Sequence, residues 1–188
     1  MGDPFDFQVL WVLQPGHLPA NRARYQIFNG KKELLASAAD TERRARFEVI
    51  PKTVPDGATL IILGADGDHM MTMIRQHVEY MTELRDAAGE LVGKIRTGST
   101  RRNYTLLDEQ DEVVAKVTGD LGLKNFAVAD STGGKLAQVR KTNAGLFKEM
   151  FTKNDHYKVE FIGPVPPAAR TLIAMVPVVL DLTLYEPL

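Results

Sequence analysis

Three segments of the chain repeat one pattern at a constant spacing of 22 residues. They are LRDAAGELVGKI from Leu84, LLDEQDEVVAKV from Leu106 and VADSTGGKLAQV from Val128. One position always holds an aspartate, and the position three residues later holds glycine or aspartate: Asp86 and Gly89, Asp108 and Asp111, Asp130 and Gly133. An aspartate can hydrogen-bond the backbone of a turn that it opens, and glycine or aspartate tolerates the positive φ that closes the turn. Each copy is therefore predicted to form a strand, a tight turn and a second strand.

A weaker copy lies 57 residues before the first, with Ile27, Asn29 and the run 34–36 at the matching positions. Residues 70–84 fit two patterns. Met70, Met73, Ile74, His77, Met81 and Leu84 fall at helical spacing, whereas Val78, Tyr80, Thr82 and Leu84 alternate as in a strand. Because the repeat that begins at Leu84 makes this residue the end of a hairpin strand, we predict strands here.

The second strand of each copy has two faces, since successive side chains point to opposite sides of a sheet. The predicted inner face holds Leu91, Gly93 and Ile95; Val113, Ala115 and Val117; Lys135, Ala137 and Val139. The predicted outer face holds Val92, Lys94 and Arg96; Val114, Lys116 and Thr118; Leu136, Gln138 and Arg140. Small residues at one level of the inner face allow another backbone to come close, as when a curled sheet wraps around an object. The alternative is that glycine and alanine simply fill a crowded core.

The C-terminal segment is the candidate for that object. After the breaker at residues 163–167, the chain is apolar on every side from Leu172 to Leu180, which is typical of a helix enclosed by protein. Pro177 and the alternation of Leu180, Leu182 and Leu184 argue for an irregular or extended segment, but we predict a helix over 168–184. Asp181 follows too few apolar residues for a membrane span of about 20, so a buried core element is favoured.

Composition limits the classes of function. The chain has 188 residues and a formal net charge of -1, so no global field attracts nucleic acid or anionic membrane, and we expect no nucleic-acid partner. It contains no cysteine, which excludes thiol catalysis and thiolate metal sites. Its first residues do not resemble a signal peptide, and Asp6 argues against N-myristoylation. We expect one cytoplasmic domain over 1–188.

Signatures of enzymes are missing from the sequence. It has no G-x-S-x-G elbow, phosphate-binding loop, H-E-x-x-H or G-x-G-x-x-G motif, so we predict no catalytic residue and no cofactor. Asp66, Asp68 and His69 offer metal ligands, but DGD is also an ordinary turn, and we favour the turn. The acidic run 108–112 lacks the spacing of a calcium loop and is predicted to be a solvated hairpin tip. No metal site is predicted.

Basic residues cluster locally and are the candidate binding residues. Convergence on one face would let them hold phosphate groups of lipids or nucleotides, and the alternative is a solvated surface balanced by carboxylates. The candidates are Arg22, Arg24, Arg43, Arg44, Arg46, Arg101 and Arg102, with Lys31 and Lys32 nearby in sequence. Asp181 is predicted to be a structural buried carboxylate that is paired, because burying a bare carboxylate is very costly. A proton-carrying or ligand-binding role is the alternative.

The whole pattern resembles the LURP-one-related and phospholipid scramblase families of the tubby C-terminal-like superfamily. The matching text is RYQIFNG, the hairpins from Leu84 and Val128, LFKEMFTKNDHYKVEF, and the closing apolar segment through Asp181. It covers residues 7–186. The resemblance implies a mainly β fold: a closed antiparallel barrel of about twelve strands, here over residues 7–162, around a central hydrophobic C-terminal helix. The cysteine-rich and proline-rich segments of animal scramblases are absent.

The resemblance also implies a function. Tubby-type domains bind phosphoinositides through basic residues, so we expect a non-enzymatic barrel that binds anionic phospholipid head groups at a membrane surface. The alternative is a protein-interaction or structural scaffold without a lipid ligand, and a more distant one is phospholipid translocation. The sequence does not define an oligomeric state.

Overall fold

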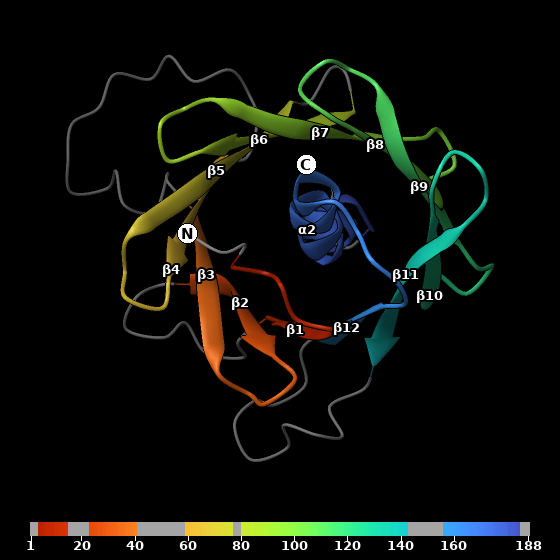
Figure 1. Cartoon of the computed structure of the whole chain (residues 1–188). Coiled ribbons are helices and arrows are strands. Elements are labelled where there is room, and N and C mark those ends of the chain that lie inside the picture. The colour runs from red at the N-terminus through yellow and green to blue at the C-terminus, as the bar shows by residue number, and fades with distance from the viewer. Residues whose placement is uncertain (1–3, 15–22, 41–58, 77–79, 143–155, 185–188) are drawn as a thin grey trace.

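Twelve antiparallel strands close into a barrel, and one helix runs through its centre (Figure 1). The structure is a computed structural model, and it describes residues 4–14, 23–40, 59–76, 80–142 and 156–184. The strands are β1 (Val9–Leu13), β2 (Ala23–Asn29), β3 (Leu34–Asp40), β4 (Thr59–Gly64), β5 (His69–Gln76), β6 (Met81–Asp86), β7 (Leu91–Thr97), β8 (Asn103–Leu107), β9 (Val113–Gly119), β10 (Asn125–Ala129), β11 (Lys135–Thr142) and β12 (His156–Phe161). The helix is α2 (Pro167–Leu184).

Strands that follow one another in the chain are neighbours in the sheet from β2 to β12. The barrel closes where β1 pairs with both β2 and β12, so that Leu10 lies opposite Asn29 on one side and Val159 on the other. Closure leaves no exposed sheet edge. The predicted barrel is thereby confirmed. Of residues 70–84, those up to Gln76 belong to β5 and those from Met81 belong to β6, while Tyr80 lies in the turn between them.

The predicted turns have the predicted geometry. Oδ1 of Asp86 accepts the backbone N–H groups of Ala88 and Glu90, both at 2.9 Å. Asp108 and Asp130 repeat these two bonds one and two repeats later. Asn29 does the same in the weaker copy, where Lys32 takes the positive φ of 67°. One polar side chain thus organises each turn from inside.

A further hairpin belongs to the same repeat, and the sequence analysis missed it. Gly64 and Gly67 stand 22 residues before Asp86 and Gly89, and their backbones make the same turn: Gly64 N–H donates to Asp68 O, and Gly67 N–H donates to Gly64 O. Because position 64 is a glycine, the aspartate that marks the other copies is absent. Backbone hydrogen bonds therefore form the same turn here without the aspartate side chain.

Each of these five hairpins carries a β-bulge just after its turn. Leu84 lies opposite Gly93, but Arg85 lies opposite Leu91, so Val92 is an extra residue. The equivalent extra residues are Leu35, Met70, Val114 and Leu136. A bulge bends its strand and increases the local twist, which favours closure of a barrel.

The bulges correct the predicted faces. Val92, Val114 and Leu136 were assigned to the wetter outer face, yet they are half-buried and pack against the core. Leu91, Val113 and Lys135 were assigned to the inner face, yet none of them is fully buried. The physical reason is the inserted residue, because one extra position reverses the alternation of sides. Beyond the bulge the prediction is correct, and Gly93, Ala115 and Ala137 are buried.

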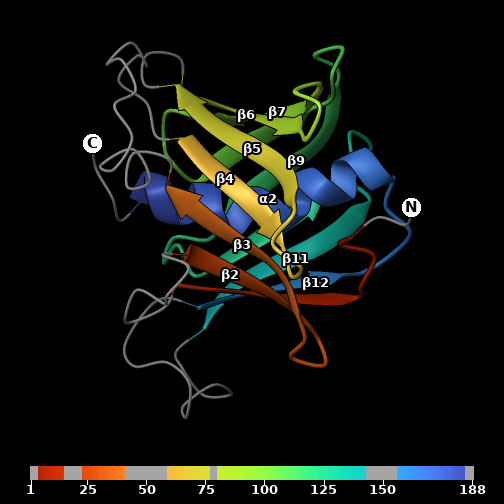
Figure 2. The ribbon, with the colours of Figure 1, turned by 90° about the vertical axis from the view of Figure 1, so that its left-hand side faces the viewer.

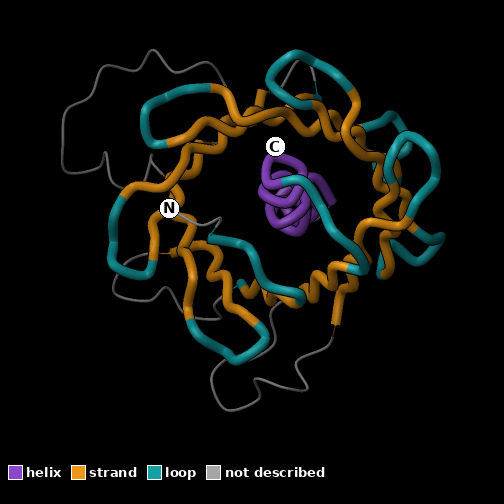
Figure 3. The backbone as a smooth tube through the Cα atoms, in the orientation of Figure 1, coloured by secondary structure: helices purple, strands orange, loops and turns teal. Residues whose placement is uncertain are grey.

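Helix α2 lies inside the ring of strands (Figures 2 and 3) and is buried from Leu172 to Thr183. It packs most extensively on β7 and also contacts β12, β1, β11 and β8. Pro177 sits within the helix. A helical proline costs about 3 kcal/mol, but burial of apolar side chains on every side outweighs this cost. By length and composition α2 could cross a membrane, but 83% of its apolar window is buried within the protein.

The helix packs closely at Gly93, one of the small residues of the predicted inner face. A Cβ added to Gly93 would lie 2.5 Å from the carbonyl oxygen of Leu107 and 2.9 Å from Cδ1 of Leu172. Both distances are shorter than the van der Waals contact distance between a Cβ atom and an oxygen or carbon atom. The glycine therefore permits close packing of β8 and α2 against β7, as the inner-face pattern predicted.

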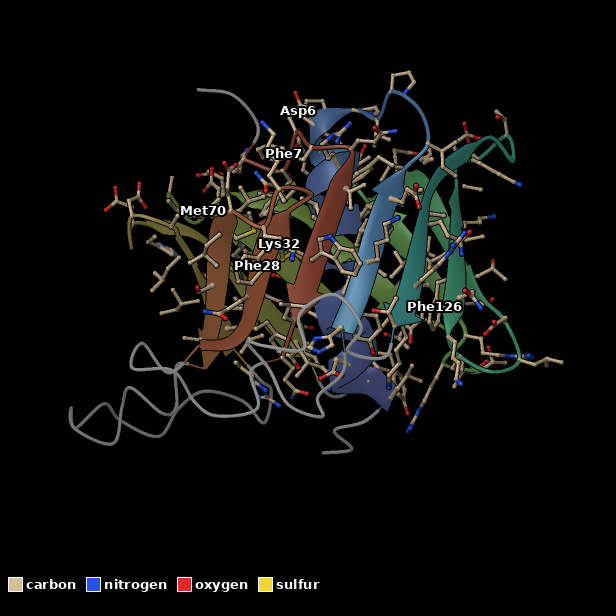
Figure 4. All side chains as sticks on the ribbon, turned by 90° about the horizontal axis from the view of Figure 1, so that it is seen from below. Asp6, Phe7, Phe28, Lys32, Met70 and Phe126 are labelled. Carbon is tan, nitrogen blue, oxygen red and sulfur yellow. The ribbon has the colours of Figure 1, made fainter. Side chains whose placement is uncertain are left out.

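The N-terminal segment is fastened to the beginning of the helix. The Arg170 guanidinium donates to the carbonyl oxygens of Phe5 and Phe7 at 3.4 Å and 3.2 Å and stacks over the ring of Phe161 at 4.3 Å. Asp6 lies 3.7 Å from the same guanidinium. Figure 4 shows Asp6 and Phe7 at the end of the barrel where α2 begins.

Candidate anion-binding end of the barrel

The two ends of the barrel carry opposite charge. We call one the acidic end: it lies where α2 begins and consists of the hairpin turns 29–33, 64–68, 86–90, 108–112 and 130–134. Its acidic residues are Glu33, Asp66, Asp68, Asp86, Glu90, Asp108, Glu109, Asp111, Glu112 and Asp130, against the lysines Lys31 and Lys32. The DGD motif lies here as the predicted turn, in which Asp66 accepts the N–H of Asp68 at 3.0 Å.

The basic end lies where α2 finishes. It consists of the described residues 23–25, 75–76, 80–81, 96–103, 118–125, 140–142 and 181–184. Its basic residues are Arg24, Arg75, Arg96, Arg101, Arg102, Lys124, Arg140 and Lys141. The carboxylates among these segments are Asp120 and the buried Asp181, and β3 ends at the same end of the barrel with Asp40. Among the residues that the structure describes, negative charge thus gathers at one end of the barrel and positive charge at the other.

Many positive charges at the basic end are not neutralised by neighbours. Within the described part of the chain, the side chains of Arg96, Arg101, Arg102, Lys124 and Arg140 form no ion pair. Other basic residues do: Lys94 pairs with Asp111 and Lys158 with Glu160, at 2.8 Å and 3.0 Å. Unpaired guanidinium and ammonium groups keep their donors available for an external anion.

Backbone hydrogen bonds join neighbouring connections at the basic end into one rim. Thr97 N–H donates to Tyr80 O at 2.8 Å, and Gly119 N–H donates to Arg102 O at 2.7 Å. Lys141 N–H donates to Lys124 O, also at 2.7 Å. These bonds place the connections around Tyr80, residues 98–102 and residues 120–124 side by side. We call Tyr80, Arg101, Arg102, Leu121 and Lys124 the rim residues.

Arg101 occupies the corner of its turn. Its φ of 54° is left-handed, its N–H donates to Gly98 O at 3.0 Å, and its carbonyl accepts the hydroxyl of the buried Tyr104 at 2.9 Å. The backbone of Arg101 is therefore held from both sides while its side chain is exposed. The guanidinium is therefore exposed to solvent on a backbone that hydrogen bonds hold in place.

Asp120 organises the next turn. Its carboxylate accepts the side-chain amide of Asn125 at 2.7 Å and the N–H of Lys124 at 2.9 Å, and these bonds lower the pKa of Asp120. Its charge is therefore engaged within the turn. Leu121 follows it and is 89% exposed.

Arg75 lies between the rim and the helix. Its Nη1 donates to Leu182 O at 2.6 Å, which satisfies a carbonyl in the last turn of α2. Burial lowers the pKa of Arg75, and the positive charges of Arg101 and Arg24 lower it further, against the opposing influence of Tyr104 and Tyr25. Residues from β2, β5 and the β7–β8 turn therefore share one electrostatic environment.

Asp181 is 1% exposed and accepts a 2.8 Å hydrogen bond from the Tyr25 hydroxyl on its Oδ2 atom. Burial raises the pKa of Tyr25, and the Asp181 charge raises it further. The carboxylate thus lies at the basic end of the barrel, and the guanidinium of Arg24 lies 6.0 Å from the centre of the Tyr25 ring.

Of the predicted binding residues, Arg24, Arg101 and Arg102 lie at the basic end. Arg22, Arg43, Arg44 and Arg46 lie outside the described residues. Lys31 and Lys32, grouped with them in sequence, belong to the acidic end, because a hairpin turn places them there.

The sequence analysis missed Arg75, Arg96 and Lys124 as members of the basic end. The repeat itself could have located the rim, because the turn from Gly98 to Asn103 recurs 22 residues later from Asp120 to Asn125. The positive φ recurs with it, at Arg101 and Leu123. The pair Arg102-Asn103 also recurs, as Lys124-Asn125, but the first position of the turn differs, with Gly98 in one copy and Asp120 in the other.

Comparison with known proteins identifies a family and a similar solved structure. The family described as Scramblase matches residues 21–187 of the chain. An X-ray structure of a protein from Arabidopsis thaliana superposes with a TM-score of 0.57 at 14% sequence identity, covering 95% of this chain and 94% of that one. No curated protein matches the sequence significantly. At that identity the Arabidopsis structure shows a shared fold alone.

Proposed function

The chain belongs to the scramblase family, and from this premise we propose that it binds anionic phospholipid head groups at a membrane surface through the basic end of its barrel. The resemblance seen in the sequence motifs is confirmed by the family match. We propose a non-enzymatic, cytoplasmic protein that associates with the membrane from one side. The observation that carries the proposal is the separation of charge between the two ends of the barrel.

Charge separation supports an oriented encounter. The acidic end is repelled by an anionic surface while the basic end is attracted, so the barrel axis turns toward the membrane normal. Each basic residue near an anionic bilayer contributes about 1 kcal/mol, and the contribution falls off within a Debye length of about 8 Å at physiological salt. Arg101 and Arg102 are adjacent in one turn and form no ion pair among the described residues, which favours binding of phosphate oxygens.

The test is co-sedimentation with vesicles of phosphatidylserine and phosphatidylcholine in equal amounts, compared with phosphatidylcholine alone. We expect binding to the anionic vesicles that weakens as salt is raised. Joint substitution of Arg101→Glu and Arg102→Glu should weaken binding by at least about 2 kcal/mol, roughly thirtyfold.

The matched control reverses two charges at the other end. Glu109→Lys and Glu112→Lys suit this purpose because both side chains are exposed, whereas Asp108 holds its turn and Asp111 pairs with Lys94. Equal effects from reversal at either end would reduce the binding to non-specific charge. Absence of binding at low salt would favour a protein-interaction scaffold.

The three arginines predicted from sequence provide a separate arm. The segment that contains Arg43, Arg44 and Arg46 connects β3 to β4. The last residue of β3, Asp40, and the first residue of β4, Thr59, lie at the basic end of the barrel. We propose that they add to the same positive field. Their joint reversal to glutamate should weaken vesicle binding by about 1 kcal/mol per charge. Labelled lipid in the same vesicles tests translocation.

A further inference from the structure

Two large apolar side chains at the basic end are exposed to solvent. Leu121 is 89% exposed and Tyr80 is 63% exposed, and both are rim residues. Exposed single apolar residues are common on protein surfaces, so exposure alone carries little weight. Their arrangement is more specific: the backbone bonds Thr97 to Tyr80 and Gly119 to Arg102 place them on either side of the Arg101–Arg102 turn.

The backbone holds both side chains outward. Asp120 fixes the turn that carries Leu121 through its bonds to Lys124 and Asn125. Tyr80 has a φ of 50°, a conformation that bulky residues rarely adopt, and its carbonyl is bonded to β7. A strained residue with an exposed ring is a common feature of functional sites. Leu121 is thus carried by a hydrogen-bonded turn, and Tyr80 by a residue whose carbonyl is bonded to Thr97 of β7.

We infer that this rim is a membrane-docking edge in which Leu121 and Tyr80 enter the interfacial region of an anionic bilayer while Arg101, Arg102 and Lys124 contact the phosphates. The inference rests on the proposed function and deepens it by naming the edge that meets the bilayer. An anionic bilayer offers phosphate above and hydrocarbon below, so it complements a surface that alternates basic and apolar groups. Tyrosine is enriched at this depth because its ring is apolar and its hydroxyl polar.

Insertion and charge make separable contributions. Electrostatic attraction weakens with salt, whereas burial of an apolar side chain does not. We therefore expect Leu121→Ser to weaken binding to the equimolar phosphatidylserine and phosphatidylcholine vesicles about tenfold, and to do so at low and high salt alike. The Arg101→Glu and Arg102→Glu pair should lose its effect as salt rises. Tyr80→Ser should act in the same direction as Leu121→Ser.

The matched control is Val113→Ser. Val113 is an apolar residue that is 40% exposed, but it adjoins the turn 108–112 at the acidic end. It should leave vesicle binding unchanged. Because the chain contains no cysteine, single Leu121→Cys and Val113→Cys variants can each carry one environment-sensitive fluorophore. Anionic vesicles should shift the emission of the label at 121 to the blue and leave that at 113 unaltered.

Failure of this inference differs from failure of the proposed function. Vesicle binding that persists with no blue shift at position 121, or with an equal shift at 113, would overturn the docking edge and leave head-group binding standing. Unchanged affinity of Leu121→Ser at high salt would overturn insertion in the same way. Absence of any co-sedimentation would overturn both.

Discussion

The Tyr25 hydroxyl donates a 2.8 Å hydrogen bond to the carboxylate of Asp181, joining β2 to the last turns of the central helix across 156 residues of sequence. Both residues are buried. A buried carboxylate needs such a donor, since an unpartnered oxygen loses its hydration without compensation. The bond therefore couples the rotation and depth of α2 to the wall of the barrel.

Removing the Tyr25 hydroxyl should destabilise the protein. Tyr25→Phe keeps the ring but leaves Asp181 without this donor, and we expect the free energy of unfolding at neutral pH to fall by about 1 to 3 kcal/mol. Urea denaturation followed by circular dichroism measures the change. Tyr80→Phe is the control, because its side chain is mostly exposed, and a loss of similar size there would disprove the special role of the Tyr25 bond.

The same pair predicts a loss of stability in alkali. The pKa of Tyr25 is raised in the folded protein by burial and by the Asp181 charge, while an unfolded tyrosine ionises near pH 10. The stabilising contribution is complete below the unfolded pKa. Above it the unfolded chain releases a proton that the folded state retains, so stability falls by up to about 1.4 kcal/mol per pH unit. The difference between wild type and Tyr25→Phe should therefore shrink above about pH 10; a constant difference would contradict the shift.

Gly93→Ala should be destabilising because the added Cβ meets the backbone of β8 and the side chain of Leu172. We expect a loss of about 1 to 3 kcal/mol. Gly30→Ala is a matched control, since the nearest neighbour of its added Cβ would be Cβ of Val9 at 3.5 Å, an ordinary contact. Equal unfolding midpoints for the two variants would show that the helix does not pack closely at Gly93.

Enlarging the alanines on the inner face tests the packing of the core elsewhere. Ala115→Leu and Ala137→Leu each add buried volume at fully enclosed positions, and we expect each to cost about 1 to 3 kcal/mol of stability. Lys116→Leu adds a similar side chain on the exposed face of β9 and should change the free energy of unfolding by less than about 0.5 kcal/mol. Thermal unfolding distinguishes them. Unaltered midpoints for the alanine variants would place those positions against open space.

Deletion of residues 168–188 should abolish cooperative folding. The barrel would lose the element that fills its centre, and the exposed inner faces of the strands would favour aggregation or an expanded state. Expression of the truncated chain followed by calorimetry tests this. A soluble product with one sharp unfolding transition would show that the strands close without α2.

Local features of the fold could be predicted from the sequence. The spacing of 22 residues identified hairpins because a tight turn depends on its own few residues, and Asp86, Asp108 and Asp130 bond the backbone within their own turns. The inner position of Gly93 and the apolar helix also followed from periodicity. The bulges did not, because an extra residue such as Val92 is defined only by the partner strand opposite it.

The sequence by itself determined the repeated hairpins, the small residues facing inward and an apolar segment suited to enclosure, since each depends on interactions between residues close in the chain. Only the tertiary structure decided which charges meet. Arg24 and Arg101 are 77 residues apart in sequence, yet both influence Arg75, because an antiparallel closed barrel brings alternate connections to the same end. The same closure placed Lys31 and Lys32 at the opposite end, and it bonded Gly119, two residues before Leu121, to the backbone of Arg102. Charge and exposure at an end of a barrel are properties of strand direction and closure, which no single segment of sequence specifies.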